Sequence, residues 1–248
     1  MSPRRIIRRV GWGLVSASLL VLAFLGYQLF ITDLLNDRVQ AEARAELDAE
    51  LAERREALPE AEVVTVELPE PEPEPAKPIP TTTTVPRADF QPESAGEEGS
   101  TLGRLTIPAI EVDEVMFAGV STETLKMGPG HMPWTPVPGQ PGNAVVSGHR
   151  TTYGRPFYDL DQLEPGDSIE VETAIGEHVF EIREIFVVKP TDVWVTEEKA
   201  GAWLTLTSCH PHFSAAERLI VQAELVRGPN FAYAQLLARQ GLGDEKRT

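Results

Sequence analysis

Residues 205–211 read TLTSCHP, and residues 218–221 read RLIV. The first stretch closes an apolar run that starts at Trp203, and it carries Cys209, the only cysteine in the chain. A polar loop separates the two stretches, and Arg218 opens the second apolar run. This pattern predicts two strands joined as a hairpin, which brings Cys209 and Arg218 near one another. A guanidinium favours the thiolate form of a nearby cysteine and can stabilise a developing oxyanion.

The N-terminal region predicts a membrane anchor. Four arginines within residues 1–9 precede 22 uncharged residues, 10–31. At about 1.5 Å per residue, a helix of this length crosses a hydrocarbon core of roughly 30 Å. A cleaved signal peptide is the alternative, but its apolar region normally has only about 7 to 15 residues. The basic flank predicts that residues 1–9 are cytoplasmic and that the chain beyond the span lies outside the cell.

Two segments separate this span from the expected folded domain. Residues 32–58 contain no Gly or Pro and are rich in Ala, Glu, Arg and Leu, which predicts an acidic, solvated helical stalk. Leu47 and Leu51 hint at a heptad that is too short to predict a coiled coil. Residues 59–100 are rich in Pro, Glu and Thr, so they predict a disordered linker that holds the domain away from the bilayer.

The expected domain covers residues 101–228. Short apolar stretches alternate there with Gly- and Pro-containing turns, at residues 103–107, 111–118, 143–147, 168–172, 178–188, 203–207 and 219–226. This recurrence, with few helical patterns between the stretches, predicts an all-β closed barrel or sandwich. Residues 229–248 predict a C-terminal tail with a short helix. The net charge of −16 and the lack of a basic cluster argue against nucleic-acid binding.

The stretch GQPGNAVVSGHR, residues 139–150, supplies a second polar strand end. Its apolar strand runs into His149, so the imidazole occupies the same type of position as the thiol of Cys209. An isolated histidine is more often structural, but a neighbouring thiol and arginine reverse that preference. His131, in a Gly- and Pro-rich loop, is expected to be structural, and His178 has no functional argument.

Two other roles for the cysteine need weighing. A lone cysteine is most often a small buried apolar residue. Metal ligation by Cys209, His210 and His212 is disfavoured, because the sequence has no second Cys/His cluster. An exported protein with one cysteine cannot form an internal disulfide, so its thiol is expected to be reactive or intermolecular. Cysteine, histidine and arginine together supply the parts needed for acyl transfer.

On these residues the sequence resembles the sortases, cysteine transpeptidases of Gram-positive surfaces. TLTSC at 205–209 is similar to their Thr-Leu-x-Thr-Cys strand, GHR at 148–150 is similar to their histidine segment, and Arg218 falls at the expected distance. Further matches around the histidine are GPGH at 128–131, PGQPGN at 138–143 and DLD at 159–161. His-Pro after the cysteine and the single N-terminal anchor most resemble the class E sortases of actinobacteria. One departure is Ser208, where the family usually has threonine; we expect the retained hydroxyl to leave the enzyme active.

The resemblance implies an eight-stranded sortase-type β-barrel with short helices and a catalytic set of His149, Cys209 and Arg218. It implies that Cys209 cleaves a Leu-(Pro or Ala)-x-Thr-Gly-like sorting signal of a surface protein between Thr and Gly, forming a thioester. An amine of a peptidoglycan precursor or of a pilin lysine then resolves this thioester. His149 would protonate the leaving amine and later deprotonate the nucleophile, while Arg218 holds the substrate or the oxyanion.

The residues around the nucleophile are assigned to substrate binding: Thr207, Ser208 and His210. His212, in the following loop, either tunes access or is solvated. We assign no cofactor and no metal ligand. The sequence leaves calcium dependence open, because acidic loop residues could bind calcium although no spacing resembles a dedicated calcium loop. The sequence leaves open whether the second signal residue is Pro or Ala, which amine is the acceptor, and the oligomeric state.

Two alternative functions remain at this point. A pilus-polymerising sortase would use a pilin lysine and often carries an Asp-Pro-aromatic lid, but the chain has no Asp-Pro pair. A non-catalytic, membrane-tethered scaffold with an inert thiol is the other alternative. A scaffold has no physical need for the thiol, the imidazole and the guanidinium together, which favours the enzyme.

Overall fold

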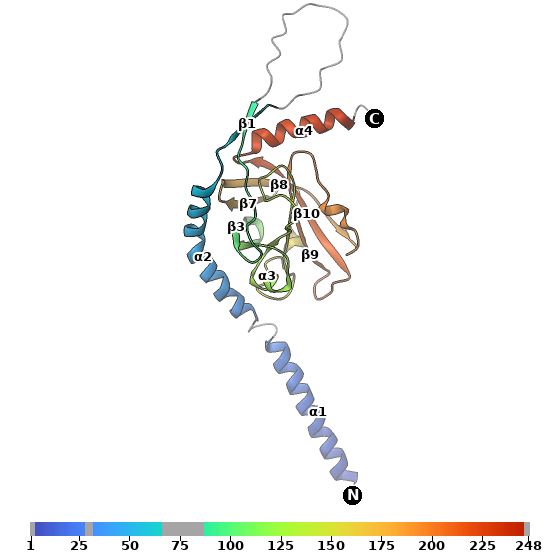
Figure 1. The fold of residues 1–248 in the computed structure, drawn as a ribbon. Coiled ribbons are helices and arrows are strands. Elements are labelled where there is room, and N and C mark those ends of the chain that lie inside the picture. Colours follow the sequence, from blue (N-terminus) through green and yellow to red (C-terminus); the bar gives the residue numbers. More distant parts are fainter. Residues whose placement is uncertain (1–2, 28–31, 66–86, 246–248) are drawn as a thin grey trace, which may run out of the picture.

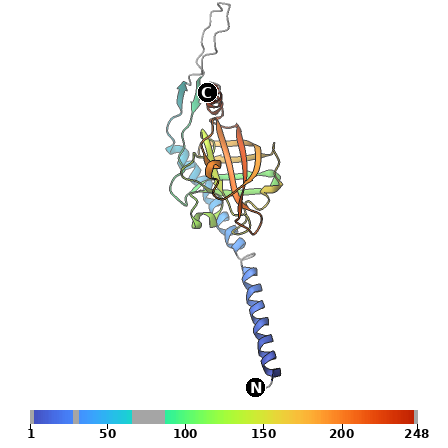
Figure 2. The same cartoon turned by 90° about the vertical axis from the view of Figure 1, so that its right-hand side faces the viewer.

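The fold is built on a closed barrel whose strand order is β10-β8-β7-β3-β4-β5-β6-β9. The structure is a computed structural model that describes residues 3–27, 32–65 and 87–245. The barrel strands are β3 (Thr101–Ile107), β4 (Val112–Ala118), β5 (Gly130–His131), β6 (Gly142–Ser147), β7 (Ser168–Thr173), β8 (Gly176–Val188), β9 (Ala202–His210) and β10 (Glu217–Arg227). The predicted eight-stranded barrel is therefore confirmed (Figures 1 and 2).

The remaining elements lie outside the barrel wall. The helices are α1 (Pro3–Gly26), α2 (Thr32–Ala57), α3 (Thr122–Met127) and α4 (Phe231–Glu245), and the short 3-10 turns are η2 (Pro108–Ile110), η3 (Leu160–Gln162) and η4 (Val193–Thr196). Strands β1 (Glu62–Thr65) and β2 (Arg87–Phe90) form a separate antiparallel pair. The C-terminal helix expected within residues 229–248 is present as α4, and its Phe231 packs against the barrel core.

The barrel core follows the two-residue period of its strands. In β7, Ile169 and Val171 are fully buried, whereas Glu170 and Glu172, which alternate with them, are not. Strand side chains alternate between the two faces of a sheet, so one face of β7 fills the interior. Phe180 of β8 and Leu204 of β9 are fully buried in the same cluster. Strand β5 has only two residues and no such alternation, which is why the sequence pattern did not predict it.

Helix α2 lies against the barrel, so the prediction of a solvated stalk is wrong. The helix itself is observed with nearly the predicted bounds. Leu47 and Leu51 are only 4% and 1% exposed and pack in one cluster with Phe117 and Ala174. The leucine spacing that hints at a coiled coil thus marks the face of α2 that covers the sheet. In Figure 1, α2 runs along the side of the barrel from the end near α3 toward β1.

The predicted disordered linker, residues 59–100, is ordered in part. Its middle, residues 66–86, lies outside the described residues. The buried carboxylate of Glu93 accepts hydrogen bonds from Thr173 Oγ1 (2.6 Å), the Ala174 amide (3.1 Å) and Arg54 Nη2 (2.9 Å). Composition alone misses this segment because a few specific polar contacts, not a run of apolar residues, hold it on the barrel.

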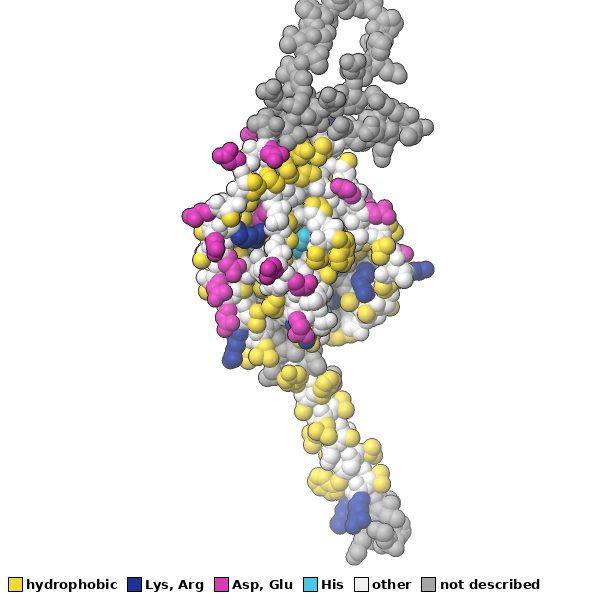
Figure 3. Space-filling model, viewed as in Figure 1, with side chains coloured by type: hydrophobic (Ala, Val, Ile, Leu, Met, Phe, Trp, Pro, Cys, Tyr) yellow, Lys and Arg dark blue, Asp and Glu magenta, His cyan; other side chains and the backbone are white. Residues whose placement is uncertain are grey.

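Helix α1 covers most of the segment predicted to span the membrane. Of that segment, residues 28–31 lie outside the described residues. Within the described ranges, no helix meets the length and apolarity needed to cross a membrane. The side chains of α1 include exposed Val10, Trp12 and Leu20, and apolar side chains are distributed along this helix in Figure 3. The same figure shows acidic side chains spread over the visible face of the barrel, with few basic ones.

Candidate active site

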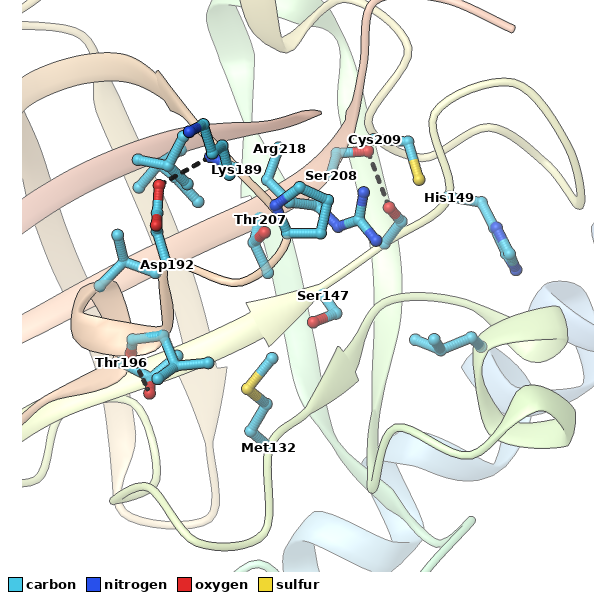
Figure 4. Close-up of a pocket in the computed structure, with 17 residues that line it drawn as sticks. Met132, Ser147, His149, Lys189, Asp192, Thr196, Thr207, Ser208, Cys209 and Arg218 are labelled. Atoms are coloured by element: carbon cyan, nitrogen blue, oxygen red, sulfur yellow. Dashed lines mark hydrogen bonds between the residues drawn. The ribbon is translucent and has the colours of Figure 1, made fainter. Parts of the chain in front are cut away.

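A cleft of about 270 Å³ opens where β6, β9 and β10 end on one rim of the barrel (Figure 4). Cys209, Arg218 and His149, the three predicted catalytic residues, all line it. Most of the other lining side chains are apolar: Leu125, Met132, Val188, Pro190, Val193, Val195 and Ile220. A reactive group in such a cleft is exposed to a ligand on one side and shielded from bulk water on the other.

The hairpin of β9 and β10 sets Cys209 against Arg218. The two residues are direct cross-strand partners in the antiparallel ladder. Directly opposite residues on one face have Cβ atoms about 4.5–5.5 Å apart. Arg218 Nη1 donates to the carbonyls of Ala215 (3.1 Å) and Glu217 (2.9 Å). No carboxylate among the described residues forms an ion pair with Arg218, so its positive charge is available to an anion in the cleft.

A parallel pairing sets His149 beside Cys209. Strand β6 runs parallel to β9 with Ser147 opposite Thr207. Two hydrogen bonds extend this register beyond the end of β6: the Gly148 amide donates to the Thr207 carbonyl (3.1 Å), and Ser208 Oγ donates to the Gly148 carbonyl (2.8 Å). The next residues in register are His149 and Cys209. In the view of Figure 4, the sulfur lies between the guanidinium of Arg218 and the imidazole of His149.

The environment of His149 favours its neutral form. Burial lowers the pKa of this imidazole, and the positive charge of Lys126 on α3 lowers it further. Nε2 is buried and has no hydrogen-bond partner among the described residues. The ring packs on Tyr153, with ring centroids 5.1 Å apart. A neutral imidazole with an unpartnered nitrogen can take a proton from a nucleophile and return one to a leaving group.

The three residues assigned to substrate binding have different positions. Thr207 and Ser208 line the cleft, whereas His210 does not contribute to its lining. Ser208 is only 3% exposed, and its hydroxyl is committed to the Gly148 carbonyl. Ser208 therefore holds the ends of β6 and β9 together. The substrate roles of these three residues remain predictions.

The buried side chain of Arg150 contacts the exposed carboxylate of Asp161, a contact that the sequence argument did not assign. The side chain of Arg150 is 1% exposed, and its Nη2 lies 2.7 Å from Asp161 Oδ1. Its Nε lies 3.2 Å from Nε2 of His212, which also lies 2.9 Å from the Tyr158 carbonyl. These contacts tie the loop after His149 to the loop after Cys209. The motifs GHR and DLD contain these two residues, but the sequence pattern does not indicate that they meet.

Two other histidines have structural roles. His131 is fully buried, and its Nε2 lies 2.8 Å from the Pro136 carbonyl. His178 is fully buried, and its Nε2 lies 3.2 Å from Thr173 Oγ1. Both lie outside the cleft lining. In the described ranges, no group of three or more His, Cys, Asp and Glu side chains is arranged to hold a metal ion.

Comparisons with known proteins agree with this geometry. The Sortase domain family model matches residues 105–226. The chain is 34% identical over 146 residues to Sortase SrtE1 of Streptomyces coelicolor, covering 52% of this chain and 42% of SrtE1. It is 31% identical over 144 residues to Sortase D of Bacillus subtilis, covering 56% of this chain and 69% of that one. The solved structure of Clostridium perfringens sortase C with the C-terminal cell wall sorting motif has a TM-score of 0.51 and 28% identity, and the match covers 53% of this chain and 74% of that one.

The fold and the site together place the chain in the class of β-barrel proteins that carry a cysteine, a histidine and an arginine on one rim. Within that class, the chain belongs to the sortase family, whose members are cysteine transpeptidases. Its similarity to SrtE1 supports the resemblance to class E sortases.

Proposed function

We propose that the protein is a transpeptidase that cleaves a Leu-(Pro or Ala)-x-Thr-Gly-like sorting signal between Thr and Gly and transfers the cleaved protein to a cell-wall amine. The single observation that carries this proposal is the double register around β9. Antiparallel pairing places Arg218 opposite Cys209. Parallel pairing of β6 with β9 ends at Ser147 and Thr207, and the hydrogen bonds of Gly148 continue this register to the position just before His149 and Cys209. The sorting motif in the sortase C complex further supports a signal of this kind as substrate.

The first half of the reaction forms a thioester. The thiolate of Cys209 attacks the threonine carbonyl carbon, and the negative charge that develops on the carbonyl oxygen lies within reach of Arg218. The carbon–nitrogen bond to glycine then breaks, and His149, which has taken up the proton that the Cys209 thiol lost, gives this proton to the leaving amine. The products are an acyl chain bound to sulfur and a free glycine amine.

The second half releases the acyl chain. An incoming amine attacks the thioester carbon, and neutral His149 takes the proton that this amine loses. The carbon–sulfur bond breaks, so a new amide forms and Cys209 returns as a thiolate. Burial lowers the pKa of His149, which favours the neutral form that this step needs.

The apolar cleft suits the uncharged residues of such a signal. Met132, Val195 and Ile220 contribute apolar surface, while Lys189 and Asp192 lie on the lining as charged residues. Burial of apolar side chains drives peptide binding, and the polar groups at Cys209 fix the scissile bond. This arrangement supports leucine and proline or alanine ahead of the cleaved bond.

Membrane attachment and an extracellular barrel are also part of the proposal. Their support is the uncharged segment 10–31 behind a basic N-terminus and the exposed apolar side chains of α1. Separation of cell membranes from the soluble fraction, followed by protease treatment of intact cells, tests both. Release of the full chain with the soluble fraction would contradict them.

The activity is tested by incubating the full chain in detergent with Leu-Pro-x-Thr-Gly and Leu-Ala-x-Thr-Gly peptides, with and without a glycine-type amine. Mass spectrometry is expected to show an amide product that depends on the amine and is lost in Cys209→Ala. A folded protein that converts neither peptide, or a Cys209→Ala variant that converts them equally well, contradicts the proposal and favours a scaffold role.

A further inference from the structure

The loop that carries His149 is supported by α3, which lies outside the barrel wall. Tyr153, four residues after the histidine, packs on its imidazole. Tyr153 and Gly154 both have left-handed backbone conformations, with φ of 53° and 76°, so the loop turns sharply beside this ring contact. The ammonium of Lys126 at the end of α3 lies 6.0 Å from the centroid of the Tyr153 ring. The position of His149 therefore depends on this turn and on the end of α3.

Asn36 of α2 contacts both the C-terminal end of α3 and the loop at Gly154. Its Nδ2 donates to the carbonyls of Lys126 and Met127, each at 2.9 Å. The last carbonyls of a helix have no partner within the helix, so this amide satisfies the C-terminal end of α3. A Cβ atom on Gly154 would overlap Oδ1 of Asn36, so the loop backbone lies directly against this amide. Asn36 is only 4% exposed and is enclosed between the two segments.

Gln40, one turn further along α2, continues the same face. Its Nε2 donates to the carbonyls of Met127 (2.8 Å) and Val115 (3.1 Å), and its Oε1 accepts from the Val115 amide (2.7 Å). Residues four apart lie on one side of a helix, so Asn36 and Gln40 both donate hydrogen bonds to carbonyls at the end of α3. The polar face of α2 thus fixes α3 to β4 and leaves Asn36 against the histidine loop.

We propose that Asn36, near the N-terminal end of α2, is a positioning residue for His149. This inference rests on the proposed transpeptidase function and deepens it. Without the Asn36 contacts, the end of α3 and the loop at Gly154 lose their common support. The imidazole then samples positions away from Cys209, and a misplacement of about 1 Å can cost roughly 100-fold in rate.

The test compares Asn36→Asp with Arg55→Gln in the full chain in detergent. Asn36→Asp keeps the side-chain shape but removes the two donated hydrogen bonds. Arg55 is the matched control, because it donates to the Ala174 carbonyl and to Glu172 (both 3.1 Å) from the opposite end of the same helix. Steady-state kinetics with a signal peptide, thermal unfolding, and NMR titration of labelled histidines are measured for each protein.

Asn36→Asp is expected to lower kcat by about tenfold or more with KM within about twofold, because positioning acts on the chemical step. The pKa of His149 is expected to rise toward its ordinary value as the ring becomes more solvated. Arg55→Gln is expected to leave both quantities unchanged. In Gly154→Ala the added methyl group would overlap the side chain of Asn36 from the loop side. This variant is expected to show the same change in His149 titration, and it replaces Asn36→Asp if that variant does not fold.

Wild-type kcat and wild-type His149 titration in Asn36→Asp would overturn the inference. Equal losses in Asn36→Asp and Arg55→Gln would also overturn it, because they would reflect stability alone. If the wild-type chain does not convert any signal peptide, the proposed function fails, and the His149 titration alone decides whether Asn36 positions the imidazole.

Discussion

Arg218 lies directly opposite Cys209 across the β9–β10 ladder, and no carboxylate of the described residues competes for its charge. The pairing is a property of the hairpin backbone, so it does not depend on a flexible loop. A guanidinium in this position can stabilise the oxyanion that forms when the thiolate attacks a carbonyl.

Replacement of Arg218 tests this assignment. Arg218→Ala is expected to lower kcat by about 100-fold or more, the usual loss when an oxyanion-stabilising donor is removed. Arg218→Lys keeps the charge but loses the planar fork, so we expect an intermediate rate. Initial rates of peptide cleavage measure both effects, and a fully active Arg218→Ala enzyme would contradict the assignment.

Ser208 offers a test of the register that brings His149 to Cys209. Ser208→Ala leaves the Gly148 carbonyl without its 2.8 Å hydrogen bond, so unfolding free energy is expected to fall by about 1–3 kcal/mol. Ser208→Thr retains the hydroxyl and is expected to keep activity within a few-fold of the parent protein. Chemical denaturation and peptide cleavage give the two readouts. A Ser208→Thr enzyme as impaired as Ser208→Ala would show that the hydroxyl is not what matters.

Leu51 tests whether α2 belongs to the folded unit. Leu51→Ala opens a cavity in a cluster where this side chain is 1% exposed, so a loss of about 2–5 kcal/mol in unfolding free energy is expected. Leu35→Ala, at a residue of the same helix that is 49% exposed, is the matched control and is expected to change stability by less than about 0.5 kcal/mol. Equal effects in thermal unfolding would mean that α2 does not pack on the barrel in solution.

His178 predicts a pH dependence of stability. Burial lowers its pKa to about 4, whereas the unfolded chain has an ordinary value of about 6.5. As the pH falls, the unfolded state therefore binds the proton before the folded state does. The free energy of unfolding is expected to fall by about 3 kcal/mol between about pH 6.5 and pH 4. Glu114 acts in the opposite sense, because burial raises its pKa to about 7 and its neutral form stabilises the fold below that pH.

The His178 contribution is isolated by comparing the parent protein with His178→Gln. Denaturant unfolding at several values between pH 4 and pH 7 gives the unfolding free energy of the parent protein minus that of the variant, and this difference is expected to fall by about 3 kcal/mol as the pH falls from 6.5 toward 4. Identical slopes would mean that His178 does not titrate differently in the folded and unfolded chains.

Local signals predicted the strands and the strand-end positions of Cys209, His149 and Arg218, whereas the choice of an eight-stranded barrel over a sandwich came from the resemblance to the sortases. Strand-length apolar runs mark the β9–β10 hairpin, and Cys209, His149 and Arg218 stand at the ends of such runs. The packing of α2 was not predictable, because Leu47 and Leu51 would look the same on a helix that meets any apolar surface. The placement of Asn36 and Glu93 depends on backbone groups far away in the sequence, which no periodicity records.

The central claim is that Cys209 carries the acyl chain. Intact-mass and peptide-mapping mass spectrometry of the full chain, incubated with a signal peptide in the absence of an amine, tests this claim most directly. A thioester on Cys209 predicts a mass increase on the peptide that contains this residue, equal to the mass of the acyl fragment that ends at threonine. This mass increase is expected to disappear when an amine is added. Peptide cleavage with no adduct on that peptide, together with undiminished cleavage by Cys209→Ala, would contradict the account.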